Sequence, residues 1–457
     1  MRNASGRFRR LGLRLGVVAV ALATAACGGS GGSAASSGGS SGSHTPVTIT
    51  LWHLFGGEEA PVFAKALAGF HKQYPWITVK PIVQPNTVND TFDPNLINAI
   101  KGGNPPDVAL PFGPDYVAQY CTSGLWQDLT PYMQRDNVKI SDFAPAAISY
   151  TNFGGNQCAL PSLTDAYGLY YNKDLLAKAG ITSPPKTMTE LMDDAKKLTV
   201  RNPDGSIKVA GFVPLNEWEE LGPSDLGRPW GAQWFDSNGD PQLATDPGWT
   251  SALEWQKQLI DWYGYDNIEK FFATYTNAEF NANNAFQTGK VAMTFDGEWR
   301  TAFIQRGAPH LNYDTAPFPA ADDQPDQYGS GRVGGTVVGI PKGAAHPDEA
   351  WLLVKYLATD TNYLVTIAND AGNVPTTKES AASPNLTLPP QFHTFIDVWN
   401  NPASSFQPPL LAQGAGYADL ADKFMSQWQA GKITDLHAAL VKLDSDITNQ
   451  LQQGEVP

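Results

Sequence analysis

The feature that most constrains the fold of this 457-residue chain is a strand–helix–strand pattern that begins at Val47. Apolar and polar residues alternate from Val47 to Leu51, as they do in a half-buried strand. The segment 61–74 then carries a proline in its first turn and an apolar stripe at helical spacing, which predicts an amphipathic helix. A second strand is predicted at 77–79. A strand, a helix and a strand within about 35 residues form a βαβ unit, which predicts a parallel sheet covered by helices.

The same alternation continues along the chain and predicts the open α/β class. Further strands are predicted near 291–295 and 336–340. Further helices are predicted near 174–178, 189–199, 249–262, 280–288, 347–358 and 436–451. About 410 residues follow His44, which is more than one hydrophobic core normally covers, so we expect two α/β lobes.

The N-terminal segment has the charge order of an export signal. Five arginines precede an apolar run that ends at Ala26, and no acidic residue occurs before Cys27. The uncharged run is too short to cross a bilayer as a helix, which needs about 20 residues, so residues 1–26 are interpreted as a cleaved signal peptide. The small residues before Cys27 resemble a lipobox, although Thr24 replaces its usual leucine; Cys27 is expected to carry a lipid. Residues 27–45 contain a run of glycine, serine and alanine, which predicts a flexible tether.

Charge and cysteine content restrict the class further. Removing residues 1–26 changes the formal charge from −14 to −19, because five arginines and no acids are lost. Such a charge disfavours nucleic acid as a partner. Two cysteines remain, Cys121 and Cys158. In an exported chain a disulfide between them is the simplest expectation, and two buried thiols are the alternative.

Several dispersed motifs resemble those of the extracellular solute-binding proteins of ABC transporters, the family that includes maltose- and glycerol-phosphate-binding members. The most specific is Tyr170-Tyr171-Asn172-Lys173-Asp174. Others are Ile49-Thr50-Leu51-Trp52-His53, Gly103-Asn104-Pro105-Pro106-Asp107, Phe286-Gln287-Thr288-Gly289-Lys290, Gly297-Glu298-Trp299, Ile340-Pro341-Lys342-Gly343 and Asn373-Val374-Pro375-Thr376. Together they span about residues 47–450.

The resemblance implies a periplasmic-binding-protein-like fold of type II, with two α/β lobes that close on a ligand through a multi-segment hinge. It places lobe 1 at 46–163 and 319–372, and lobe 2 at 164–318 and 373–457. The crossing segments are expected near 164–168, 313–319 and 372–375. It also implies a sugar ligand, a membrane permease as partner, no cofactor, a monomer, and a lipid-anchored location on the outer face of the cytoplasmic membrane.

A sugar site needs carboxylates or amides for hydroxyl groups and aromatic rings for the apolar faces of the sugar. The loops after the first strands are expected to contribute, because ligands of open α/β sheets bind at the carboxyl ends of strands. The tryptophans of the Gly- and Pro-rich stretch are interpreted as loop residues. The candidate ligand-binding residues are His53, Phe55, Glu58, Phe112, Asp115, Asp165, Tyr167, Trp218, Trp230, Trp234, Trp299, Gly334, Gly335 and Trp399. Packing, turn or hinge roles are the alternative for each.

Alternatives to sugar binding have weaker support in the sequence. The glycine pattern 329–334 precedes a strand where a dinucleotide site requires a helix, and the histidines show no metal-ligand spacing. A glycoside hydrolase with paired carboxylates stays open, as does a sensor or adhesin built on the same two lobes. A glycerol-phosphate-type ligand would need cations, for which Arg228, Arg300 and Arg332 are the candidates. The many tryptophans favour a neutral mono- or oligosaccharide.

Overall fold

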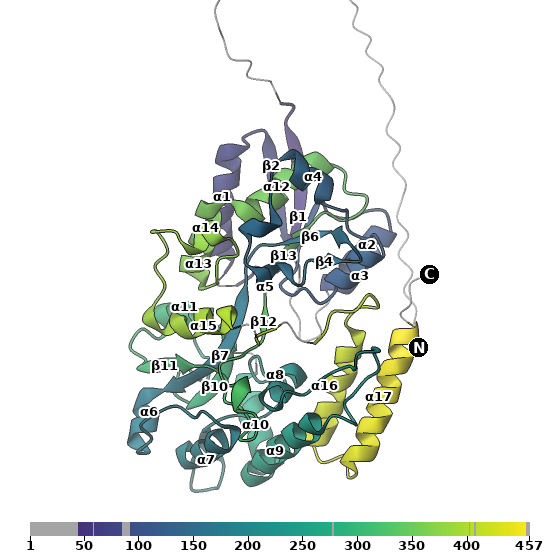
Figure 1. Cartoon of the computed structure of the whole chain (residues 1–457). Coiled ribbons are helices and arrows are strands. Elements are labelled where there is room, and N and C mark those ends of the chain that lie inside the picture. Colours follow the sequence, from purple (N-terminus) through teal and green to yellow (C-terminus); the bar gives the residue numbers. More distant parts are fainter. Residues whose placement is uncertain are drawn as a thin grey trace, which may run out of the picture. The chain divides into compact units, whose positions relative to one another are not determined.

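The computed structural model describes residues 44–57, 59–84, 92–276, 278–401, 403–405 and 408–453. The signal peptide, Cys27, nearly all of the predicted tether and Glu58 lie outside these residues. From Thr45 onward the chain forms one compact unit. This unit contains two large sheets, each with its own helices, besides two small hairpins, and β7 leads from one part to the other (Figure 1).

The first sheet has the strand order β2-β1-β3-β13-β6. Its strands are β1 (Val47–His53), β2 (Ile77–Val83), β3 (Val108–Leu110), β6 (Ala159–Pro161) and β13 (Val337–Gly339). β1 pairs in parallel with β2 and β3, and α1 (Ala60–Gln73) connects β1 to β2, so the predicted βαβ unit is confirmed. β13 runs antiparallel to both of its neighbours.

Helices cover both faces of this sheet. The largest apolar cluster on one face joins Leu51 and Phe70 with residues of α12 (Pro347–Thr359) and α13 (Thr361–Ala371). The cluster on the other face includes Ala109 and residues of α2 (Phe92–Lys101) and α3 (Val117–Thr122). Adjacent residues of β3 therefore contribute to opposite clusters, as strand geometry requires.

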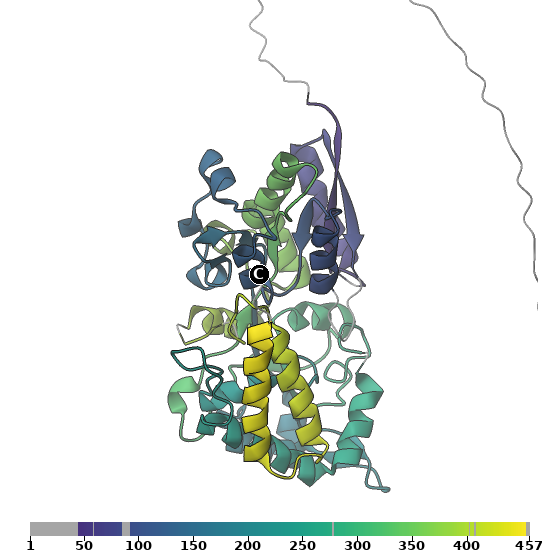
Figure 2. The ribbon, with the colours of Figure 1, turned by 90° about the vertical axis from the view of Figure 1, so that its right-hand side faces the viewer.

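The second sheet is built around β7 (Asp165–Asn172). β10 (Met293–Gly297) and β11 (Tyr313–Ala316) flank it, and β12 (Val333–Gly334) pairs with its first residues. All three pair with β7 in the antiparallel sense, so the expectation of a parallel sheet is wrong for this lobe. One large apolar core lies here. At its edge α16 (Gly416–Gln429) and α17 (Leu436–Gln453) pack side by side (Figure 2).

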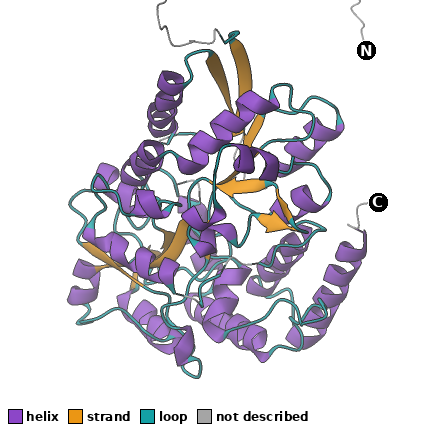
Figure 3. Ribbon diagram, turned by 45° about the horizontal axis from the view of Figure 1, so that its top comes forward, coloured by secondary structure: helices purple, strands orange, loops and turns teal. Residues whose placement is uncertain are grey.

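Short elements and connecting helices complete the body (Figure 3). The remaining helices are α4 (Thr130–Arg135), α5 (Pro145–Ile148), α6 (Lys173–Lys178), α7 (Met188–Leu198), α8 (Pro223–Gly227), α9 (Pro247–Tyr263), α10 (Tyr265–Tyr275), α11 (Arg300–Gly307), α14 (Lys378–Ala381) and α15 (His393–Asn400). Two small hairpins are β4–β5 (Asn152–Phe153 and Asn156–Gln157) and β8–β9 (Val200–Arg201 and Ile207–Val209).

The helix predicted at 280–288 is absent from the structure, which has a series of turns there. Asparagine side chains explain the difference. The Oδ1 of Asn284 accepts hydrogen bonds from the backbone N–H groups of Phe286 and Gln287, and the Oδ1 of Asn281 accepts one from Asn283. Such local bonds offer the backbone an alternative to helix hydrogen bonds.

The segments that connect the lobes differ from the expected ones. Residues 313–316 form β11 within the second sheet, and Ala320 pairs with Thr187, so the chain does not cross at 313–319. We place this crossing between β12 and β13, at Gly335 and Thr336, instead of at 319.

Residues 374–387 likewise keep contacts with the first lobe, through the pairing of Thr377 with Phe143 and the packing of α14 on α13. We place the last crossing between 387 and α15.

Cys121 and Cys158 form the predicted disulfide, with their Cα atoms 5.4 Å apart. Both cysteines are buried in the cluster beside α3. Within the part of the chain that the structure describes, no helix is long and apolar enough to span a membrane.

Candidate functional site

A pocket of about 290 Å³ lies between the two lobes. The first lobe contributes residues that follow β1 and β3, and the second lobe contributes the start of β7 and the segments around β10 and β12. Eight of the candidate ligand-binding residues line this pocket: Phe55, Phe112, Asp115, Asp165, Tyr167, Trp299, Gly334 and Gly335. The structure therefore brings together residues that are up to 280 positions apart in the chain.

Two carboxyl groups and an amide meet at the inner end of the pocket. The Nδ2 of Asn373 donates hydrogen bonds to Asp165 Oδ1 at 3.0 Å and to Glu298 Oε1 at 3.1 Å. The other oxygen of Glu298 accepts the backbone N–H of Ala166 at 2.8 Å. Glu298 is completely buried, whereas Asp165 keeps a partly exposed face. The hydrogen bond from Asn373 therefore holds Asp165 in place, while part of its carboxylate stays accessible to the pocket.

Burial perturbs the protonation of this pair. Desolvation raises the pKa of Asp165 to about 6, against the opposing effects of its hydrogen bonds to Glu298 and Asn373. Desolvation and the charge of Asp165 raise the pKa of Glu298 well above its usual range. Because both carboxyl groups share the amide of Asn373 and the charge of Asp165 disfavours ionisation of Glu298, the titrations of the two groups are linked.

Aromatic rings form the side walls. On the second lobe, the rings of Tyr167 and Trp299 meet edge to face with centroids 5.4 Å apart. On the first lobe, Phe55 and Phe112 make a similar edge contact at 5.1 Å. The Nε1 of Trp299 is buried without a hydrogen-bond partner among the described residues. The pocket thus offers apolar faces from both lobes together with polar groups at its base.

Arg332 lines one side of the pocket and has two acidic partners. Its guanidinium lies 3.7 Å from the centroid of the Tyr167 ring. It donates a hydrogen bond to Glu220 Oε2 at 2.6 Å and lies 3.4 Å from Asp225 Oδ1. These carboxylates and the ring hold the side chain in one position.

A buried ion network holds the loop that carries Glu220. Arg300 is inaccessible to solvent and contacts Asp296 at 2.5 Å and Glu219 at 3.0 Å. Desolvation raises the pKa of Glu219 to about 8, although the charge of Arg300 opposes this. The backbone of Glu219 lies in the left-handed region, at φ +50°. The buried ion network can offset the strain of this conformation.

Of the three arginines considered for an anionic ligand, two form ion pairs with carboxylates. Arg332 and Arg300 are paired with carboxylates. Arg228 is buried and donates to the carbonyl oxygens of Ala403 and Ser405. A phosphate-bearing ligand would therefore have to displace existing partners.

Gly335 occupies a position that only glycine can fill. Its φ is +139°, and a Cβ there would lie 2.2 Å from the carbonyl oxygen of Leu163. The crossing between β12 and β13 therefore runs directly against the crossing that leads into β7. Gly334 pairs with Asp165 and accepts a hydrogen bond from the Tyr150 hydroxyl at 2.8 Å.

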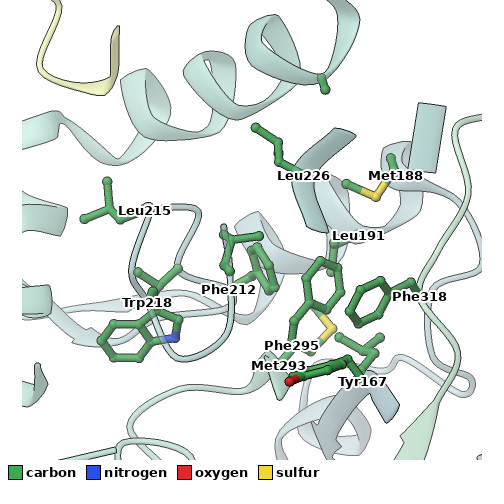
Figure 4. Packing of buried hydrophobic residues seen from close by; sticks show 14 of the residues in the cluster. Tyr167, Met188, Leu191, Phe212, Leu215, Trp218, Leu226, Met293, Phe295 and Phe318 are labelled. Carbon is green, nitrogen blue, oxygen red and sulfur yellow. The ribbon is translucent and has the colours of Figure 1, made fainter. Parts of the chain in front are cut away.

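The other candidate residues lie away from this pocket. His53 is 3% exposed and packs on Phe63, and burial lowers its pKa to about 4. Trp218 is buried beside Leu215 in the second-lobe core, and its Nε1 donates to Thr294 Oγ1 (Figure 4). Trp399 is also part of this core. These side chains have packing roles.

Two further tryptophans of the Gly- and Pro-rich stretch are packed as well. Trp230 lies against Trp255, with ring centroids 6.0 Å apart. Trp234 meets Trp249 edge to face at 5.0 Å, and lines a separate cavity. The interpretation as a loop is wrong for Trp230, which ends a 3₁₀ helix at Arg228–Trp230. Trp234 does lie in irregular backbone, which can be buried when its polar groups find partners. Glu58 lies outside the described residues.

Sequence reasoning missed several residues that line the pocket: Glu59, Glu220, Phe280, Arg332, Asn373 and Pro408. The motif around Asn373 predicts only a crossing, and Arg332 is a sequence candidate only for an anionic ligand. Phe280 falls in a segment with the pattern of a helix. Nothing in the local sequence distinguishes Glu220 from the neighbouring acidic residues Glu217 and Glu219.

Comparisons with known proteins agree with this architecture. Residues 56–363 match the family model described as bacterial extracellular solute-binding protein. The maltotriose-binding protein of Pyrococcus abyssi is 22% identical over 406 residues, covering 88% of this chain and 82% of that protein. The diacetylchitobiose binding protein of Streptomyces coelicolor is 24% identical over 373 residues, covering 80% and 82%. The solved structure of CpMnBP1 with mannotriose bound has a TM-score of 0.78 and 28% identity, and the match covers 88% of this chain and 100% of that one.

Proposed function

Because the chain belongs to the bacterial extracellular solute-binding protein family, we propose that it captures a neutral mono- or oligosaccharide in the pocket between its lobes and delivers it to an ABC permease. The observation that carries the proposal is the composition of the pocket. Aromatic rings from both lobes surround a carboxyl–amide cluster, which is the combination that the apolar faces and the hydroxyl groups of a sugar require.

The proposed contacts follow from the positions of the side chains. Trp299 and Tyr167 provide an aromatic wall on one lobe, and Phe55 and Phe112 provide one on the other. Asp165 accepts hydrogen bonds from sugar hydroxyl groups. Because the walls belong to different lobes, a bound sugar stabilises the closed arrangement relative to an open one.

Relatives support this choice of solute. Their names specify maltotriose and diacetylchitobiose, and mannotriose is bound in the structure of CpMnBP1. The carboxylate partners of Arg300 and Arg332, and the position of Arg228 outside the lining of the pocket, argue against a glycerol-phosphate-type solute. The similar proteins are binding proteins, which favours binding over hydrolysis of the saccharide.

A thermal-shift screen of mono-, di- and trisaccharides tests the proposal, followed by calorimetry of each ligand found. We expect Trp299→Ala to weaken binding at least tenfold, since burial of a sugar face on the ring is lost. Trp262→Ala is the matched control, because Trp262 is 40% exposed on α9 and lies outside the pocket. Binding that survives Trp299→Ala unchanged would contradict the site, and release of shorter saccharides would contradict the binding function.

We further propose that the mature protein is a monomer held by a lipid on Cys27 at the outer face of the cytoplasmic membrane. The basic and apolar segment before Cys27 and the Gly/Ser-rich segment after it support this arrangement. As a random coil, the tether would keep the body about 20 to 25 Å from the lipid. Mass spectrometry of the native N-terminus tests it: an unmodified Cys27, or a Cys27→Ala variant that stays with the membrane, would contradict the anchor.

A further inference from the structure

Phe280 is a large apolar side chain that is exposed at the solute pocket. Six large apolar side chains are exposed among the described residues: Val83, Ile140, Val200, Trp262, Phe280 and Val441. Single exposed apolar side chains are common on protein surfaces, so exposure alone indicates no function. Phe280, which is 47% exposed, differs from the other five because its ring borders the pocket that is proposed to hold the solute.

The turn that carries Phe280 is held by hydrogen bonds next to this residue. The backbone N–H of Asn281 donates to the carbonyl oxygen of Ala278 at 3.2 Å, which closes a turn with Phe280 in its third position. The carbonyl oxygen of Glu279 accepts a hydrogen bond from Arg300 Nη1 at 2.5 Å. Because Arg300 is itself inaccessible to solvent, the backbone of Phe280 is anchored to the body of the lobe although the ring is exposed.

The ring of Phe280 extends the aromatic wall that Trp299 begins. It meets Phe303 edge to face, with ring centroids 6.2 Å apart. Phe303 is 3% exposed and lies one helical turn after Trp299, where its backbone N–H donates to the carbonyl oxygen of Trp299 at 3.2 Å. Phe280 and Trp299 are therefore both fixed relative to α11, and the wall continues from the half-buried Trp299 to the exposed Phe280.

A fixed and exposed aromatic ring suits the apolar face of a sugar. Covering the ring removes apolar surface from water, and a ring that is already held in position loses little conformational freedom when a ligand covers it. The pocket has a volume of about 290 Å³, which is near the lower end of the range of about 300 to 1,000 Å³ for small-ligand sites. A saccharide of several units therefore extends beyond the enclosed part of the pocket.

We propose that Phe280 forms an outer subsite of the solute pocket, at which its ring packs against the apolar face of a second sugar unit. The first unit lies between Asp165 and Trp299, and the second unit projects past Trp299 toward solvent. The protein then binds an oligosaccharide more tightly than the monosaccharide from which it is built. This inference rests on the proposed function, because the inner part of the pocket must hold the first unit.

Calorimetry with saccharides of increasing length tests the outer subsite. The probes are glucose with maltose and maltotriose, glucose with cellobiose and cellotriose, and mannose with β-1,4-linked mannobiose and mannotriose. The corresponding series of any further ligand from the thermal-shift screen is added. In each series that binds, we expect the dimer to bind about tenfold more tightly than the monomer, because the second unit covers the ring. Where the monomer binds too weakly for direct titration, its displacement of the trimer gives its affinity.

Two substitutions separate the outer subsite from the inner one. Phe280→Ala is expected to weaken dimers and trimers about tenfold and to leave the affinity for the monomer unchanged. Trp299→Ala is expected to weaken every member of a series, because it removes the inner wall that holds the first unit. The difference between the two length profiles is a readout that a general loss of stability would not produce.

Three further variants control for the fold and for the loss of an exposed ring. Phe280→Tyr keeps the ring and is expected to keep the preference for longer saccharides. Trp262→Ala removes an exposed ring of α9, outside the pocket, and is expected to change no affinity. If Phe280→Ala fails to fold, Phe280→Leu replaces it, because leucine keeps an apolar contact with Phe303 but has no flat face for a sugar.

The possible failures are distinct. If the monomer binds as tightly as the dimer and trimer, the outer subsite is refuted and the proposed function stands. The same holds if Phe280→Ala changes no affinity, or weakens the monomer and the trimer by the same factor. If no saccharide of these series or of the thermal-shift screen binds, both proposals fail.

Discussion

Replacing Asp165 with asparagine is expected to stabilise the protein without ligand at neutral pH and to weaken solute binding. Asp165 and Glu298 are two carboxyl groups held by one amide, that of Asn373. An asparagine at position 165 keeps an oxygen for the Nδ2 of Asn373, and its own amide can donate to Glu298. The substitution thereby removes the repulsion between the carboxylates while it conserves the shape of the cluster.

The size of the stabilisation expected from Asp165→Asn follows from the shift in the pKa of Asp165. Burial raises the pKa of Asp165 from 3.8 to about 6. The folded state therefore binds the proton more tightly than the unfolded state does, and stability is lost as the pH rises through this range. The cost is small below pH 3.8, lies between about 1 and 2 kcal/mol at pH 5 and approaches about 3 kcal/mol at pH 7. Because Asp165 is partly exposed, 3 kcal/mol is an upper bound for the gain from Asp165→Asn.

Urea denaturation of both proteins at pH 5 and pH 7 measures the effect. We expect the gain in free energy of unfolding to be larger at pH 7 than at pH 5, and solute affinity to fall at least tenfold because a charged acceptor is lost. Asp107→Asn is the control: Asp107 is also buried, but it accepts hydrogen bonds from Thr50 and from the backbone N–H of His346. The control should be destabilised. An Asp165→Asn protein that is less stable at pH 7, or equally affected at both pH values, would refute the reasoning.

Two further predictions concern the framework of the site. Replacing Cys121 and Cys158 with serine opens a link between residues separated by 37 positions, so the unfolding free energy of the first lobe should fall by about 4 kcal/mol in urea denaturation; an unchanged midpoint would show that the disulfide constrains little. Gly335→Ala should lower the thermal midpoint and the solute affinity together, because its Cβ would meet the carbonyl oxygen of Leu163. Gly205→Ala, which also has a positive φ but open space around it, should cost only about 1–2 kcal/mol and leave affinity unchanged.

Part of the site could be predicted because strand ends and motifs have a local signature. Phe112 and Asp115 follow a buried strand, and the residues at the carboxyl end of such a strand face the crevice of an α/β sheet. Asp165 and Trp299 stand beside motifs with a characteristic spacing. The contacts that hold Asp165 and Trp299 nevertheless come from distant residues, Asn373 and Tyr167.

The tryptophans show what local sequence cannot predict. Trp218 and Trp299 both lie in irregular segments, yet Trp299 lines the pocket and Trp218 packs against Phe271. Which of two aromatic residues is buried depends on what covers it, and the cover of Trp218 comes from α10, more than fifty residues along the chain. Composition and periodicity describe residues that are close in sequence and carry no information about such a distant partner.

The sequence by itself determined the α/β class, the first βαβ unit and the family, because these depend on local periodicity and motifs. It left Cys121 and Cys158 open between a disulfide and two buried thiols, and the structure shows the disulfide. Only the tertiary structure decided where the chain crosses between lobes and which side chains share the pocket. Arg332 and Asn373 approach one another through the antiparallel pairing of β7 with β12 and the contact of Val374 with Thr164, and Glu220 joins them through its ion pair with Arg332. Those pairings join segments more than a hundred residues apart, and their free energies depend on the whole folded body.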